Sequence, residues 1–152
     1  MKNFELGSVY AIDTVKGIGI FQLVNIPEDK RHGVEMIRVS YDLYTEVPKS
    51  FQPVFDQDFF YIRFPVKAAL KRKMINYIGH SDLIPGFKIP RYYRTPHYFN
   101  RDEWIIFDSE TNQIEQVKTL TVEQLKLSTD SVWNIAFLKE RLEEGWRLEN
   151  WK

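Results

Sequence analysis

Hydrophobic and polar positions in the first part of the chain follow a pattern that predicts β-strands. Residues 8–14 and 18–26 are rich in Ile, Val, Phe and Leu, and a short connection that contains Gly17 joins them. Two β-favouring runs with such a connection form a hairpin. Both faces of this hairpin carry apolar side chains, so we expect it to be covered on both sides or strongly curled, as in a small barrel. A third strand is predicted over residues 34–41.

The strand pattern continues after a polar stretch. Residues 59–64 predict a fourth strand, which Pro65 closes because its missing N–H interrupts a hydrogen-bonded ladder. Residues 66–74 predict a short helix, since good helix formers lie there between cations. The alternative for that stretch is a strand edge that runs into residues 75–78.

Prolines and a second pair of apolar runs mark the segment that follows. Pro90 and Pro96 predict that the end of residues 79–96 is extended and loop-like, because proline fixes its own backbone and restricts the residue before it. Residues 104–108 and 114–120 predict a second hairpin around a polar turn.

In the last third of the chain, apolar residues recur every three or four positions instead of every second position, which predicts helices. Thr121 and Gln124 have the spacing of a capping box that opens a short helix. Asp130 or Ser131 then caps the most strongly periodic helix, and Gly145 ends it. The apolar stripe of this helix consists of Val132, Ile135, Leu138, Leu142 and Trp146.

The elements together predict an α+β fold. We expect a mostly antiparallel β-sheet of five to seven strands, which is either curled or closed into a barrel-like form. The C-terminal helix over residues 131–144 should pack on this sheet. The 152 residues suit a single domain over 1–152, since no Ser/Gly/Pro-rich linker divides them. The chain has no Cys, which excludes disulfides, thiolate nucleophiles and Cys-ligated zinc. With no apolar run long enough to span a bilayer, a cytoplasmic location is expected.

Charge is distributed unevenly along the chain although the total is zero. Residues 66–101 carry eight cations against the single acid Asp82, a local charge of +7. Residues 1–65 carry seven cations and nine acids, and residues 102–152 carry six and eleven. The basic middle segment therefore either packs against the acidic C-terminal third or faces an acidic partner.

Groups for catalysis are sparse. The three histidines, His32, His80 and His97, lie far apart in sequence, and none belongs to a metal-ligand spacing. We therefore expect no enzyme activity, no catalytic residue, no metal and no cofactor. The alternative is an enzyme, a hydrolase whose cleft is lined by Asp56, Asp58 and His80.

The part of the basic segment over residues 87–101 is the strongest functional signal, because aromatic rings and cations alternate in it. Such a stretch can stack bases and neutralise phosphates of a single-stranded nucleic acid, or it can anchor a protein partner. In a third interpretation its rings cover the sheet and its arginines pair with the acidic C-terminal helix. We favour a protein partner, since a net charge of zero attracts a polyanion weakly. The predicted contact residues are Arg91, Tyr92, Tyr93, Arg94, His97, Tyr98 and Arg101.

Landmarks of one protein family recur in order along most of the chain. They are an opening hairpin at residues 4–12 and 17–24, an Ile-Gly stretch at 76–79, a Pro and Phe stretch at 85–90, and C-terminal elements at 104–108 and 138–146. In these landmarks the chain resembles the immunity protein 26 family, the antidotes of bacterial polymorphic toxin systems. The resemblance implies a non-catalytic protein that binds and neutralises a cognate toxin encoded beside it. It supplies no motif of functional residues, so the contact residues above follow from charge and aromaticity alone.

Overall fold

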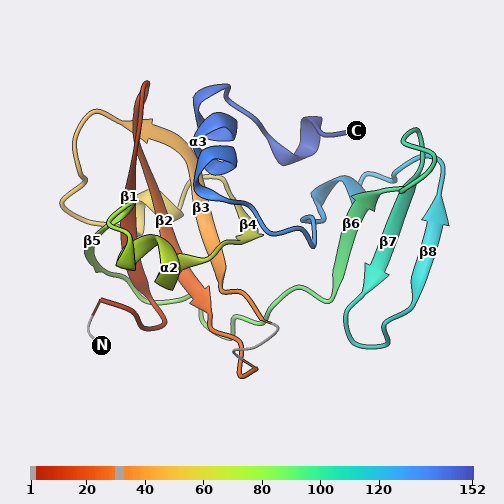
Figure 1. Ribbon diagram of the computed structural model, residues 1–152, viewed down its shortest axis with the longest axis horizontal. Helices are drawn as coiled ribbons and strands as arrows, with labels where there is room; N and C mark the ends of the chain where they lie inside the picture. Colours follow the sequence, from red (N-terminus) through yellow and green to blue (C-terminus); the bar gives the residue numbers. More distant parts are fainter. Residues whose placement is uncertain (1–2, 30–32) are drawn as a thin grey trace. The chain divides into compact units, whose positions relative to one another are not determined.

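The chain divides into two compact units in a computed structural model that describes residues 3–29 and 33–152 (Figure 1). Unit 1 comprises Met1–Phe87 and Val132–Trp146, and unit 2 comprises Lys88–Ser131 and Arg147–Lys152. Within the described residues, unit 1 contains an antiparallel sheet of five strands and unit 2 one of three strands. The predicted α+β class is confirmed, whereas the single domain over 1–152 stays a prediction.

The sheet of unit 1 is open, so the predicted curled, barrel-like form is wrong. Its strand order is β4-β3-β2-β1-β5, and every neighbouring pair is antiparallel. Among the described residues β4 and β5 form its two edges, and no pairing joins them. The predicted first hairpin is confirmed, with Thr14 opposite Gly17. The strands are β1 (Ser8–Thr14), β2 (Gly17–Asn25), β3 (Met36–Tyr44), β4 (Phe59–Arg63) and β5 (Asn76–His80).

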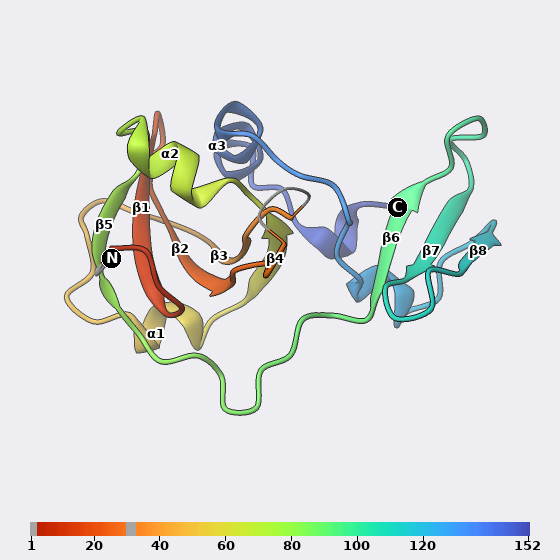
Figure 2. The ribbon, with the colours of Figure 1, turned by 60° about the horizontal axis from the view of Figure 1, so that its bottom comes forward.

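Both faces of this sheet are covered, and this explains the apolar residues that suggested a barrel. On one face Phe21 and Leu23 belong to the main core, beneath helices α2 (Val66–Lys71) and α3 (Ile135–Glu143). On the other face Val9, Ala11 and Ile20 form a second cluster with Val54 and Phe55 of helix α1 (Gln52–Phe55). Figure 2 shows α1 on the opposite side of the sheet from α2 and α3. Because helices cover both faces, closure into a barrel is not required.

Helix α3 packs on the sheet as predicted but begins later than predicted. Asn134 caps it, and its side-chain oxygen accepts a hydrogen bond from the Phe137 N–H at 2.8 Å. Val132 is therefore outside the helix and 53% exposed, and its backbone forms a bridge to Arg63 instead. The predicted end is confirmed, because Gly145 adopts a φ of 70° directly after the last turn.

Close packing fixes α3 against β2. Leu138 and Leu142 are buried and face the sheet. A Cβ at Gly19 would lie 2.7 Å from Leu142 Cδ1, so the absence of a side chain there permits this approach. Phe60 of β4 joins the same core through its ring contacts with Trp133 and Trp146, at 5.5 and 5.2 Å between ring centroids.

Unit 2 contains the second predicted hairpin and one strand that the sequence pattern did not indicate. Its sheet has the order β6-β7-β8, with β6 (Tyr92–Pro96), β7 (Trp104–Asp108) and β8 (Ile114–Val117). The loop-like interpretation of residues 79–96 is wrong for β6. Pro96 is tolerated because it ends an edge strand, where its missing N–H leaves no ladder position empty.

Two short 3₁₀ helices complete unit 2. They are η1 (Gln124–Lys126) and η2 (Leu148–Asn150). The predicted capping box precedes η1, since the Gln124 N–H donates to Thr121 Oγ1 at 3.1 Å and the Thr121 N–H donates to Gln124 Oε1 at 3.0 Å. Within the described residues, every helix falls short of the length and apolarity that a bilayer crossing requires.

A candidate partner-binding site in unit 2

The seven predicted contact residues all lie in unit 2, with Arg91 directly before β6 and the others on β6 and the loop that follows it, but their environments differ. Tyr93 and Arg94 are buried, and Arg94 is 0% exposed. Arg91 is exposed but engaged in ion pairs. The others remain accessible to different extents: His97 is half-buried, while Tyr92, Tyr98 and Arg101 are exposed. Because they are buried, Tyr93 and Arg94 offer little or no surface to a partner, and the contact set as a whole stays a prediction.

Arg94 holds the C-terminal segment against β6. Its guanidinium contacts the rings of both Trp104 and Trp151, 4.7 and 4.6 Å from their centroids, and the two rings contact each other edge to face. It also donates hydrogen bonds to four backbone carbonyls that are distant in sequence. These belong to Leu125 at 3.1 Å, Leu127 at 3.0 Å, Leu148 at 2.7 Å and Trp151. One side chain thus joins β6, η1 and η2, and its role is structural.

Arg91 is neutralised within its own sheet. Its Nε and Nη2 donate to the two carboxylate oxygens of Asp108 at 3.0 and 2.9 Å, and Nη1 lies 3.3 Å from Glu110. The hydrogen bond from Arg91 holds the pKa of Asp108 well below its ordinary value. Arg91 therefore pairs with acids of the β7–β8 hairpin, not with the C-terminal helix.

The Arg91–Asp108 pair predicts a pH-dependent stability. The pKa of Asp108 is depressed in the folded state, so the pair stabilises fully above the ordinary carboxyl pKa of about 3.9 and is lost as pH falls through the folded value. Asp108→Asn should therefore lower the melting temperature at neutral pH, and its difference from wild type should shrink between about pH 4 and pH 2. Thermal unfolding of both proteins at each pH measures this. A difference that stays constant down to pH 2 would contradict it.

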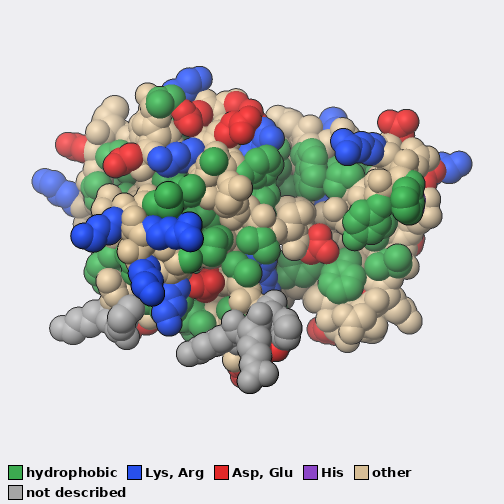
Figure 3. Space-filling view, viewed as in Figure 1, with side chains coloured by type: hydrophobic (Ala, Val, Ile, Leu, Met, Phe, Trp, Pro, Cys, Tyr) green, Lys and Arg blue, Asp and Glu red, His purple; other side chains and the backbone are tan. Residues whose placement is uncertain are grey.

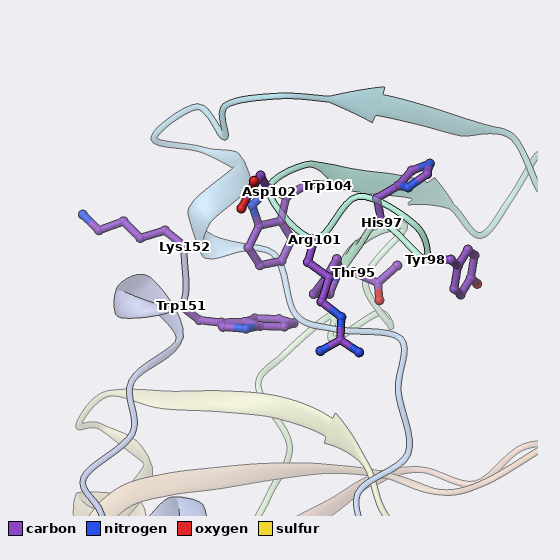
Figure 4. A pocket seen from close by; sticks show the side chains of 9 residues that line it. Thr95, His97, Tyr98, Arg101, Asp102, Trp104, Trp151 and Lys152 are labelled. Carbon is purple, nitrogen blue, oxygen red and sulfur yellow. The ribbon is translucent and has the colours of Figure 1, made fainter.

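His97, Tyr98 and Arg101 come together at a cavity of about 610 Å³ in unit 2. Figure 4 shows Arg101 and the Trp151 ring projecting into one common space, from the β6–β7 loop and from the C-terminal segment. The remaining lining residues are Thr95, Pro96, Asp102, Trp104, Trp151 and Lys152. Trp104, Trp151 and Lys152 were not in the predicted set. For Trp151 and Lys152, the signal that could have found them is a Trp next to a cation in the sequence.

The loop beside this cavity presents two rings to solvent. Tyr98 is 78% exposed and Phe99 is 95% exposed. The loop is braced by His97, whose Nδ1 accepts hydrogen bonds from the N–H groups of Phe99 at 3.2 Å and Asn100 at 3.1 Å. The backbone N–H of His97 in turn donates to the backbone carbonyl oxygen of Glu103 at 2.9 Å. A braced turn with two exposed rings is typical of a docking surface.

The cations of the basic segment are divided between the two units. Of its eight cations, Lys67, Lys71, Arg72 and Lys73 belong to unit 1, on α2 and the turn after it, and the other four belong to unit 2. Figure 3 shows Lys and Arg side chains gathered over the region where α2 lies in Figure 1. Unit 2 as a whole contains eight cations and eight acids, so its own net charge is zero.

The residues proposed for a hydrolase cleft do not all line the cavity that Asp56 reaches. Asp56 lines a cavity in unit 1, but neither Asp58 nor His80 lines that cavity. The Nε2 atom of His80 lies 3.1 Å from the Leu6 carbonyl oxygen. His32 lies outside the described residues.

The arrangement in unit 2 combines exposed rings, two cations at a cavity and the Arg94 hydrogen bonds that hold the C-terminal segment. Comparison of the chain with protein-family models, with curated proteins and with solved structures found no match. The resemblance to the immunity protein 26 family stays a prediction.

Proposed function

We propose that this chain is an immunity protein, a non-enzymatic cytoplasmic protein that binds and inhibits a cognate bacterial polymorphic toxin. The observation that carries the proposal is the pair of exposed rings, Tyr98 and Phe99, on the braced loop of unit 2. The family resemblance in the sequence supports the choice of a toxin as the partner. An inhibitor of this kind requires a complementary surface and no reactive centre, which agrees with the sparse catalytic groups.

The proposed interface assigns different tasks to its side chains. Tyr98 and Phe99 supply apolar area that is buried on binding, and such rings are frequent anchors of protein interfaces. Arg101 and Lys152, at the edge of the cavity, attract acidic groups of the toxin and speed its association. The cavity itself accepts a protruding side chain of the toxin.

Rigidity of the surface contributes to affinity. Binding costs less conformational entropy when the contact residues are already held in place. The hydrogen bonds to His97 fix the loop, and the Arg94 guanidinium fixes the Trp104 and Trp151 rings below it. Tyr93 and Arg94 thus belong to the support of the interface, while Tyr92, His97, Tyr98 and Arg101 remain proposed contacts.

Co-expression with the product of the neighbouring gene tests the proposal. A toxin domain encoded directly before this chain should arrest bacterial growth when expressed alone, and co-expression of this chain should restore growth. The two purified proteins should then elute as one complex in size-exclusion chromatography. Growth arrest that persists, with the proteins eluting separately, would overturn the proposal.

The second candidate is a single-stranded nucleic-acid-binding module that uses residues 87–101. The observation in its favour is that the exposed rings of Tyr98 and Phe99 lie beside the cations Arg101 and Lys152, a combination that stacks bases and neutralises phosphates. The zero net charge of unit 2 opposes it. Binding of a fluorescent oligothymidine at several salt concentrations distinguishes the two, since a steep loss of affinity with salt favours the nucleic acid.

A further inference from the structure

A buried arginine lies on the face of the unit 1 sheet that α1 covers. Arg38 of β3 is 4% exposed and stands opposite Gln22 of β2 in the strand register. Its Nη2 donates to Gln22 Oε1 at 2.5 Å, and Gln22 Nε2 donates to the Ser81 carbonyl oxygen at 2.6 Å. The glutamine is thereby held in one orientation, and it holds the guanidinium in turn.

Arg38 forms no close ion pair among the described residues, although the Asp56 carboxylate attracts its charge from a distance. None of the ion pairs found there involves it, and its Nε is buried without a hydrogen-bond partner. The guanidinium lies 4.5 Å from the Phe55 ring centroid and 5.0 Å from that of Phe59, and these contacts offset part of the desolvation cost. Burial still lowers the pKa of Arg38, because the loss of water outweighs the attraction of the Asp56 carboxylate. A buried cation that is compensated only in part is costly unless a ligand completes it.

Arg38 lines a cavity of about 530 Å³ between α1 and the segment after β5. It forms the buried part of the lining together with Phe55, while two exposed acids, Asp56 and Asp82, stand at the outer part. Gln52 donates to Asp56 Oδ1 at 2.9 Å and so orients that carboxylate. The other lining residues are Leu83, Ile84 and Pro85, which are apolar.

We propose that this cavity binds a small zwitterion, an amino acid or a short peptide, with its carboxylate on Arg38 and its ammonium group on Asp56 or Asp82. A simple anion such as phosphate fits poorly, since the two acids outnumber the one cation. A simple amine fits poorly because the buried end of the cavity is positive. The apolar wall formed by Phe55, Leu83 and Ile84 favours a ligand with an apolar side chain. This proposal does not rest on the toxin-binding function.

Calorimetric titration of the full chain tests the ligand class. The probes are the standard amino acids, the dipeptide Leu-Leu, the single-charge analogues isopentylamine and 4-methylpentanoate, and inorganic phosphate. At least one zwitterion should bind. Each single-charge analogue should bind at least about tenfold more weakly than that zwitterion, since each loses one charged hydrogen bond. Tighter binding of Leu-Leu or of a free amino acid identifies which source the site takes. Absence of binding by every zwitterion, or equal binding by an analogue, would overturn the proposal.

Variants of the lining test the assigned contacts. Asp56→Asn and Asp82→Asn keep the side-chain size on an exposed rim, and together they should weaken zwitterion binding about tenfold or more. Asp42→Asn, an exposed acid of unit 1 outside the lining, should leave binding unchanged. Arg38→Met should abolish binding, with circular dichroism as the check on folding. Unchanged affinity in the Asp56 and Asp82 double variant would overturn the assignment even if Arg38→Met does not fold.

Discussion

Replacing Arg94 with alanine is expected to destabilise unit 2 by at least about 3 kcal/mol, because four carbonyl acceptors lose a charged donor at once and each buried acceptor left unpaired costs about 1–3 kcal/mol. The substitution also removes the cation that contacts the Trp104 and Trp151 rings. Urea unfolding followed by tryptophan fluorescence measures the loss. Hydrogen exchange at the amides of β6 and β7 shows whether the loss is located in unit 2.

Two further variants give the Arg94 experiment its controls. Arg94→Lys retains the charge but not the planar fork of five donors, so it should recover only part of the stability. Arg101→Ala removes an exposed arginine from the same unit and should change the free energy of unfolding by less than about 0.5 kcal/mol. An Arg94→Ala protein as stable as wild type would show that the carbonyls find other partners and that Arg94 is not the clamp.

Phe60→Ala is expected to destabilise unit 1 by about 3–5 kcal/mol, the usual cost of truncating a buried phenylalanine. Phe60 joins β4 to the helical layer through Trp133 and Trp146 and also contacts Tyr41, at 4.9 Å between ring centroids. The cavity left behind would therefore loosen several neighbours. Chemical unfolding of the variant measures the effect.

The same substitution at a second phenylalanine separates packing from residue type. Phe99→Ala removes an equal ring from a position that is almost fully exposed, so it should change stability by less than about 0.5 kcal/mol. Phe60→Leu keeps most of the volume and should cost less than about 1.5 kcal/mol. Similar losses for Phe60→Ala and Phe99→Ala would contradict the burial on which the core assignment rests.

Local signals predicted the elements that local chemistry determines. The first hairpin follows from alternation around Gly17, and the end of α3 follows from the need for a left-handed residue at Gly145. The capping box at Thr121 also forms as its spacing indicates. Each of these features depends on residues a few positions apart.

Features that depend on distant residues could not be predicted in the same way. Pro96 suggested a loop where β6 is found, because the sequence does not show that β6 is an edge strand paired with β7. The open sheet could not be distinguished from a barrel, since the second face is covered by α1, a helix that the pattern did not indicate. Helix α3 was predicted to start too early because Val132 continues the apolar spacing, although its backbone bridges to Arg63.

The candidate site illustrates the same limit for side chains. Arg91 and Arg94 lie three residues apart in one basic stretch, yet one pairs with Asp108 at the surface and the other is enclosed. The difference arises from the carbonyls of η1 and η2, which the fold brings to Arg94 from more than thirty positions away. The aromatic and basic composition identified the correct region, and tertiary structure decided which of its residues face solvent.

The most direct test of the central claim is the affinity of the Tyr98→Ser, Phe99→Ser double variant for the toxin domain encoded by the neighbouring gene. If these rings anchor the interface, the dissociation constant should rise about thirtyfold or more, since hot-spot side chains contribute about 2 kcal/mol or more. Val122→Ser, which removes another exposed apolar side chain of unit 2 outside the cavity lining, should leave the affinity unchanged. A double variant that is as stable as wild type and binds the toxin domain equally tightly would contradict the account.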